Sequence, residues 1–143
     1  MTLDSFPDQP PPGASHAKAT ITVHESHAEP FDETAGPPLS VLSIRETFEG
    51  DIAGDSAVRA LQIRQEDGPV HMVSLQRVSG SLSGRTGSFA LQGREAIENG
   101  TIKARWSVVP GSGTGELAGL RGIGGFAGKF GEGSQGTLEY WFE

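Results

Sequence analysis

Apolar and polar residues alternate along most of the chain, and a period of two is typical of β-strands that bury one face. The first clear run follows Lys18, where Ala19, Ile21 and Val23 share one face and threonine and histidine occupy the other. No window of about eleven residues keeps a helical period without interruption by glycine. The pattern therefore predicts an all-β protein.

The alternation predicts eight strands, at residues 18–24, 39–50, 50–65, 70–80, 81–96, 101–109, 121–128 and 135–143. Turn residues separate them. Glu66–Pro69 forms one such break, and Asn99-Gly100 is the strongest hairpin signal in the chain. Strands joined by connections this short pair antiparallel.

Closing eight antiparallel strands into a barrel leaves no unpaired edge. We therefore predict a single eight-stranded antiparallel β-barrel over residues 17–143, with a sandwich as the alternative. Residues 1–16 are rich in Pro, Asp, Ser and Gly. Such a segment buries too little apolar surface to offset its ordering entropy, so we predict a flexible, disordered tail.

Charge and composition narrow the function classes. The net charge is −7 and the pI is about 5.0, which argues against a nucleic-acid groove and against binding to anionic membranes. With no cysteine, disulfides and thiolate chemistry are excluded. The N-terminal segment has neither a basic nor an apolar signal region, so the predicted location is cytoplasmic. No cofactor is predicted.

The glycine-rich stretch from Trp106 to Gly128 resembles a dinucleotide-binding loop, since Gly113-x-Gly115-x-x-Ala118 follows a strand. That loop must open a helix, and the glycines that follow Glu116 forbid one because each costs a helix about 1 kcal/mol. We predict instead a turn and an extended strand whose bare face lets a neighbouring backbone or aromatic ring approach.

Several stretches carry a resemblance to a known family: "FEGDIAGDS", "SLQRVSGSLSGRTGSF", "GRTGSFALQ", "WSVVPGSGTGELAGLRGIGGF" and "LEYWF". They are similar to an uncharacterised bacterial family, domain of unknown function 3224, over residues 17–143. The family resembles the allene-oxide-cyclase-like and dirigent barrels. The resemblance implies a closed eight-stranded antiparallel barrel and supplies no catalytic residues.

The histidines do not predict a metal site. His24 and His27 are three residues apart, so on a strand they point to opposite faces. A third ligand at a suggestive spacing is missing from the sequence, and we predict no metal.

One carboxylate falls on an apolar face. Glu46 lies among Leu42, Ile44 and Phe48, where burial would raise its pKa and suit it to general acid or base work. The alternative is a structural salt bridge to Arg77 or Arg59. The amides of Gln76 and Gln92 face either the lumen or the exterior.

Aromatic residues gather late in the chain. Trp106 and Phe126 are predicted in the core. Tyr140 and Phe142 share one face, and Trp141 takes the other, where it packs on a loop or marks an oligomer interface.

These patterns favour a module that binds a small apolar or amphipathic ligand at one barrel mouth. The predicted ligand-binding residues are Glu46, Gln76, Arg77, Gln92, Trp106, Phe126 and Tyr140. One alternative is a homo-oligomeric structural or interaction protein. The other is a cyclase- or isomerase-like enzyme on a lipid-derived substrate, with Glu46 and either Gln76 or Arg77 as its polar set.

Overall fold

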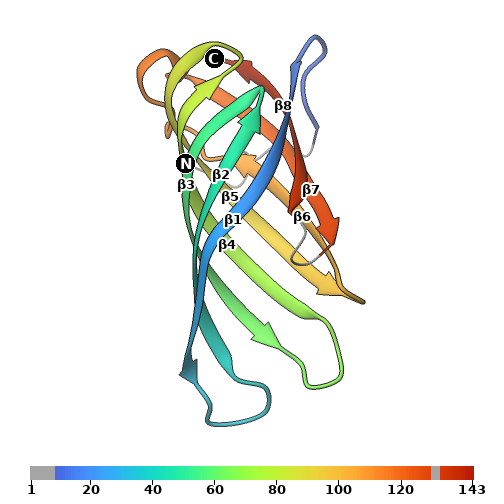
Figure 1. Ribbon diagram of the computed structural model, residues 1–143. Helices are drawn as coiled ribbons and strands as arrows, with labels where there is room; N and C mark the ends of the chain where they lie inside the picture. Colours follow the sequence, from blue (N-terminus) through green and yellow to red (C-terminus); the bar gives the residue numbers. More distant parts are fainter. Residues whose placement is uncertain (1–8, 130–132) are drawn as a thin grey trace.

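The computed structural model describes residues 9–129 and 133–143, and Figure 1 shows them as a curled antiparallel sheet. Eight strands form it: β1 (Ser15–Asp32), β2 (Leu39–Gly50), β3 (Ile52–Arg64), β4 (Val70–Leu82), β5 (Arg85–Glu98), β6 (Thr101–Val108), β7 (Leu120–Lys129) and β8 (Ser134–Phe142). Each strand pairs with its neighbours in sequence, and β1 also pairs with β8, so the sheet closes. The predicted barrel is confirmed over the sandwich.

The strands are strongly tilted around the barrel axis. A line of directly paired residues leaves β1 at Ala17, crosses every other strand and returns to β1 at Ala28, 28 − 17 = 11 residues further along. A large offset of this kind accompanies a large tilt. Rows of paired residues therefore wind gently around the wall.

One end of the barrel is closed by apolar side chains. Ile52, Leu82 and Leu120 are buried there with exposures of 0–1%. Leu117 is also fully buried and belongs to a short 3-10 turn, η2 (Gly115–Leu117), in the connection between β6 and β7. This turn packs on β5 and plugs the closed end.

The opposite end is open because β1 extends beyond the last residue that pairs with β8. The β1–β8 pairing stops at Ile21, and from Thr22 to Asp32 the strand pairs only with β2 among the described residues. We call residues 22–32 the β1 overhang. Register shifts at His24 and Phe31 bend it. Inner-face positions at this end are partly exposed, and Val23 on the overhang is 51% exposed.

Three predicted boundaries are wrong. The first strand does not end at residue 24: its two bulges let the polar overhang continue to Asp32. Gly80 is not a strand end but lies inside β4, and the turn before β5 falls at Ser83-Gly84, whose φ angles are 48° and 88°. Residues 15 and 16 of the predicted tail belong to β1, whereas residues 1–8 lie outside the described part.

Candidate functional site

A layer of polar side chains crosses the barrel interior between two apolar clusters. The larger apolar cluster fills the closed end, and the smaller one, built on Ala60, Val70 and Met72, lies toward the open end. Because alternate residues of each strand point inward, five polar residues of β2–β5 share this layer. We call it the polar cluster, and it consists of Glu46, Ser56, Ser74, Gln76 and Glu95.

Two hydrogen bonds order the polar cluster. Gln76 Nε2 donates to Glu46 Oε1 at 3.4 Å, and Ser74 Oγ donates to Glu95 Oε2 at 2.7 Å. Gln76 is 8% exposed and Ser56 4%. The cluster is thus held by side chains that the barrel itself fixes.

Both carboxyl groups titrate abnormally. Burial raises the pKa of Glu46 to about 7, and repulsion from Glu95 contributes. Burial also raises the pKa of Glu95, against the opposing effect of the Ser74 hydrogen bond. Each carboxyl is therefore easier to protonate than an exposed glutamate.

The polar cluster holds two buried atoms without a protein partner. Ser56 Oγ and Glu95 Oε1 make no hydrogen bond to any residue in the ranges 9–129 and 133–143. A buried polar group left unpaired costs roughly 1–3 kcal/mol. Both atoms remain able to bond a molecule that reaches the layer.

The expected salt bridge of Glu46 does not form. Arg59 and Arg77 are exposed on the outer face, because each sits next to buried inward residues of its own strand. Arg77 pairs in register with Ala57 and Ala90, both also outward. The prediction that Arg77 would join Glu46 in one polar set is therefore corrected by strand parity.

Bare glycines make room for the largest side chain in the interior. Trp106 is 5% exposed and pairs in register with Gly93 and Gly124. A Cβ on Gly136 would lie 3.2 Å from its ring. Phe126 packs 5.2 Å away, centroid to centroid. The core position predicted for Trp106 is confirmed, whereas Phe126 is partly buried and packs against the core.

The remaining predicted site residues lie apart from the polar cluster. Tyr140 faces inward at the closed end, 9% exposed, with its ring 6.2 Å from that of Phe142. Gln92 faces outward. Of the seven predicted ligand-binding residues, the structure brings Glu46 and Gln76 together, with Trp106 and Phe126 at the neighbouring wall. That any of them binds a ligand stays a prediction.

Ser56, Ser74 and Glu95 were missed by the sequence analysis. The signal was available for Glu95: period two carried through "LQGREAI" places Leu91, Gly93, Glu95 and Ile97 on one face. The two serines are too common in exposed positions for pattern alone to single them out.

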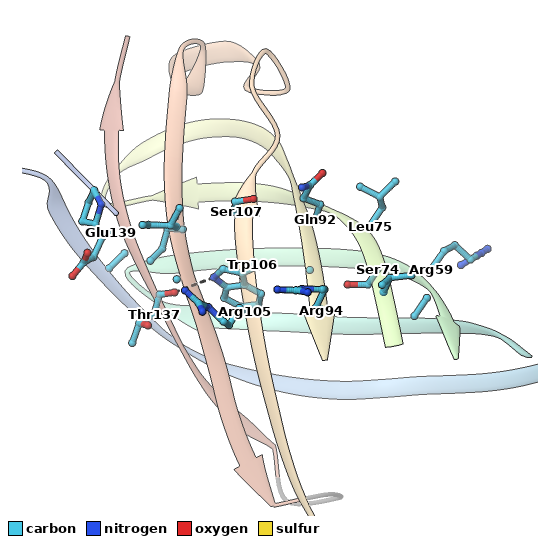
Figure 2. Close-up of a pocket in the computed structure, with 18 of the residues that line it drawn as sticks. Arg59, Ser74, Leu75, Gln92, Arg94, Arg105, Trp106, Ser107, Thr137 and Glu139 are labelled. Atoms are coloured by element: carbon cyan, nitrogen blue, oxygen red, sulfur yellow. Dashed lines mark hydrogen bonds between the residues drawn. The ribbon is translucent and has the colours of Figure 1, made fainter. Parts of the chain in front are cut away.

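The outer wall is also hollowed. A furrow of about 1100 Å³ runs around the wall, with lining residues from all eight strands, and Figure 2 shows Leu75, Gln92 and Ser107 side by side on three of these strands. Leu75 is 58% exposed. Its lining also includes Ser74, a member of the polar cluster, and Trp106.

Comparison with known proteins identifies the family of this chain. A family model described as a protein of unknown function, DUF3224, matches residues 17–143. The chain belongs to the DUF3224 family. A crystal structure of a DUF3224 protein of unknown function from Shewanella oneidensis MR-1 is similar to it, with 26% identity and a TM-score of 0.77 over 91% of this chain and 98% of that one. No curated protein matches. The further likeness to allene-oxide-cyclase-like and dirigent barrels stays a prediction.

The glycine-rich stretch of this DUF3224 chain is no nucleotide loop. Gly113 and Gly115 lead into the single turn η2, and β7 follows as extended backbone. Thr114 instead fastens this connection to β5, since its hydroxyl accepts a hydrogen bond from Ser88 N at 3.0 Å. The predicted strand is confirmed.

Within the part of the chain that the structure describes, no three histidine or acidic side chains gather as metal ligands. His24 Nε2 lies 2.9 Å from Thr47 Oγ1. Over the same residues, none of the helical structure has the length and apolar character needed to cross a bilayer.

Proposed function

We propose that this DUF3224 barrel binds a small amphipathic molecule through its open end, with the polar head of the molecule at the polar cluster. The observation that carries the proposal is Glu95 Oε1, which is buried, has no partner among the described residues and lies in one layer with a second carboxyl group. A ligand that donates a hydrogen bond there removes the penalty of leaving this atom unpaired.

The chemistry of the polar cluster favours a head group that donates hydrogen bonds. Its carboxylates and hydroxyls are rich in acceptors. The arginines nearest in sequence are all exposed on the outer face: Arg45, Arg59, Arg77 and Arg94. A protonated amine supplies both the donors and the positive charge that two buried carboxylates lack.

The open end supplies a surface for the apolar part of the molecule. Leu42, Ile97 and Ile102 are only partly buried and pack on the cluster of Ala60, Val70 and Met72. A short alkyl chain covering them gains roughly 25 cal/mol for each Å² of apolar surface removed from water. In this proposal the head group binds at the polar cluster, and the apolar chain extends along the inner face toward the open end.

Octylamine, octanol and octanoate test the proposal because they share a chain and differ in the head. We expect affinities in the order amine, alcohol, carboxylate at pH 8, measured by titration with NMR detection of backbone amides. Glu95→Gln should weaken octylamine at least about tenfold, equivalent to 1.4 kcal/mol. Shifts should map to β2–β5.

Glu49→Gln is the matched control. Glu49 lies on β2 three residues from Glu46, is exposed and faces outward, so its loss should leave octylamine binding unchanged. Equal affinities for the three compounds, or an equal effect of Glu49→Gln and Glu95→Gln, would contradict the proposal. So would binding that maps to the outer wall.

A further inference from the structure

Two rows of directly paired residues run side by side across the outer face of β1–β6. The first row is Glu29, Val41, Leu61, Val73, Arg94 and Arg105. The second row lies two residues away on β2–β6 and three residues away on β1, where Phe31 is bulged. It is Asp32, Leu39, Ile63, His71, Ala96 and Lys103. Both begin with an acid on the β1 overhang and end with a base on β6. The residues between these ends are apolar except for Arg94 in the first row and His71 in the second.

The middle of the rows is an exposed apolar surface. Leu61 is 51% exposed and Val73 50%, and Phe31, at the second bulge, is 55% exposed. These three residues also line a hollow of about 570 Å³ that lies over both rows. Contiguous exposed aliphatic residues around a hollow mark an interaction surface more often than isolated ones do.

The basic end of the rows is unbalanced within one molecule. Arg94 and Arg105 are exposed and directly opposite each other, an arrangement of like charges that destabilises a strand pair. The ion pairs of the described residues include neither of them, nor Lys103. The acidic end lies five strand spacings away, roughly 24 Å, so it cannot neutralise these charges in the same molecule.

We propose that the two rows form the contact surface of a homodimer. A twofold axis that lies across the rows near Leu61 and Val73 brings the acidic end of one copy to the basic end of the other. Leu61 then meets Val73 at the centre of the first row, and Ile63 meets His71 at the centre of the second. A surface whose two halves complement each other is what a symmetric dimer requires.

The strand tilt makes such a contact feasible. Because the rows wind gently around the wall, their centres face one direction. The long side chains of Arg94, Arg105 and Glu29 extend from the flanks to span the distance that curvature opens there. Arginine is enriched in interfaces for this combination of reach and multiple donors.

A second copy fits these rows better than other occupants. Nucleic acids are held by basic grooves with aromatic stacking residues, whereas the centre here is mostly aliphatic and one end acidic. An anionic membrane would be repelled by Glu29 and Asp32. A second copy matches both charges at once.

Sedimentation velocity on the full chain tests the dimer. The wild type should show a concentration-dependent species of twice 15.0 kDa. Arg94→Glu with Arg105→Glu should lower the dimer association constant at least about a hundredfold, or 2.7 kcal/mol. Glu29→Arg with Asp32→Arg should do the same. An equimolar mixture of the two double variants should restore the dimer, because opposite charges then meet again.

Lys18→Glu with Lys129→Glu is the control of equal charge change, since both lysines are exposed and outside the rows. It should sediment as the wild type does, and circular dichroism should show every variant folded. A wild type that stays monomeric at about 0.5 mM, where even a dissociation constant of about 1 mM would leave a substantial dimer fraction, would overturn the proposal. A mixture that stays monomeric would overturn it equally.

Discussion

The indole Nε1 of Trp106 donates a hydrogen bond to the carbonyl oxygen of Thr137 at 3.0 Å. Trp106 belongs to β6 and Thr137 to β8, so the bond spans β7, which lies between them. It reaches because Gly124, the register partner of Trp106 on β7, carries no side chain. The side chain of Trp106 therefore links β6 to β8 across β7.

Filling the space beside Trp106 should destabilise the barrel. In Gly124→Ala, the new Cβ would collide with the carbonyl oxygen of Thr137, which is backbone and cannot turn away. We expect a loss of roughly 1–3 kcal/mol or more, and a fall in Tm of about 2–4 °C for each kcal/mol, measured by thermal unfolding. Ala127→Ser, at an exposed site on the same strand, should change stability by less than about 0.5 kcal/mol. A Gly124→Ala protein as stable as the wild type would contradict this packing.

Truncating Leu117, which closes one end of the barrel, should lower the free energy of unfolding far more than truncating the exposed Leu75. Leu117 has no exposed surface, whereas Leu75 is 58% exposed. We expect Leu117→Ala to lower the free energy of unfolding by about 2–5 kcal/mol, because it opens a cavity. Leu75→Ala should remain within about 0.5 kcal/mol of the wild type. Urea denaturation of both variants measures the difference, and similar losses would show that η2 does not seal the core.

Stability should fall as pH rises through the titration range of Glu46. The unfolded chain titrates this group near 4.5, whereas the folded protein holds its proton until pH about 7. Between these values the folded state binds more protons, so its advantage is complete below pH 4.5 and is lost above pH 7. The full shift corresponds to at most roughly 3 kcal/mol.

Glu46→Gln removes this titration and should flatten part of the profile. The variant should resemble the wild type at pH 5 and exceed it in stability at pH 8, as measured by chemical denaturation at both values. Glu49→Gln, exposed on the same strand, should keep the wild-type slope. An unchanged slope in Glu46→Gln would mean that this carboxyl is not buried as described.

Strand alternation was enough to predict an all-β chain of eight strands and the inward position of Glu46, because both follow from which residues share a face. The choice of a barrel over a sandwich rested on the advantage of having no unpaired edge and on the family resemblance. The turn at Ser83-Gly84 was misplaced because four glycines lie between residues 80 and 93, and local sequence does not say which of them bends the chain. The overhang was missed because the bulge at His24 interrupts the alternation and because Pro30 is atypical of a strand interior.

The partners of Glu46 could not be predicted from the sequence of its own strand, because they depend on the register of the neighbouring strands. Arg59 and Arg77 were plausible partners until strand register placed them on the outer wall. The two outer rows likewise exist only across strands, since Glu29 and Arg105 are 76 residues apart in the chain (105 − 29). Contacts of this range follow from closure and register, which period-two patterns leave undetermined.

Among residues 9–129 and 133–143, the overhang of β1 has an open hydrogen-bonding edge eleven residues long (32 − 22 + 1). Bulges at His24 and Phe31, the imino residue Pro30 and the carboxylates of Glu25 and Glu29 all interrupt it. A more regular overhang, for example with valine in place of Pro30, would expose backbone N–H and C=O groups that a strand of another molecule could pair with. The irregularity of these few residues hinders strand pairing with a second molecule, which is the step by which fibres grow.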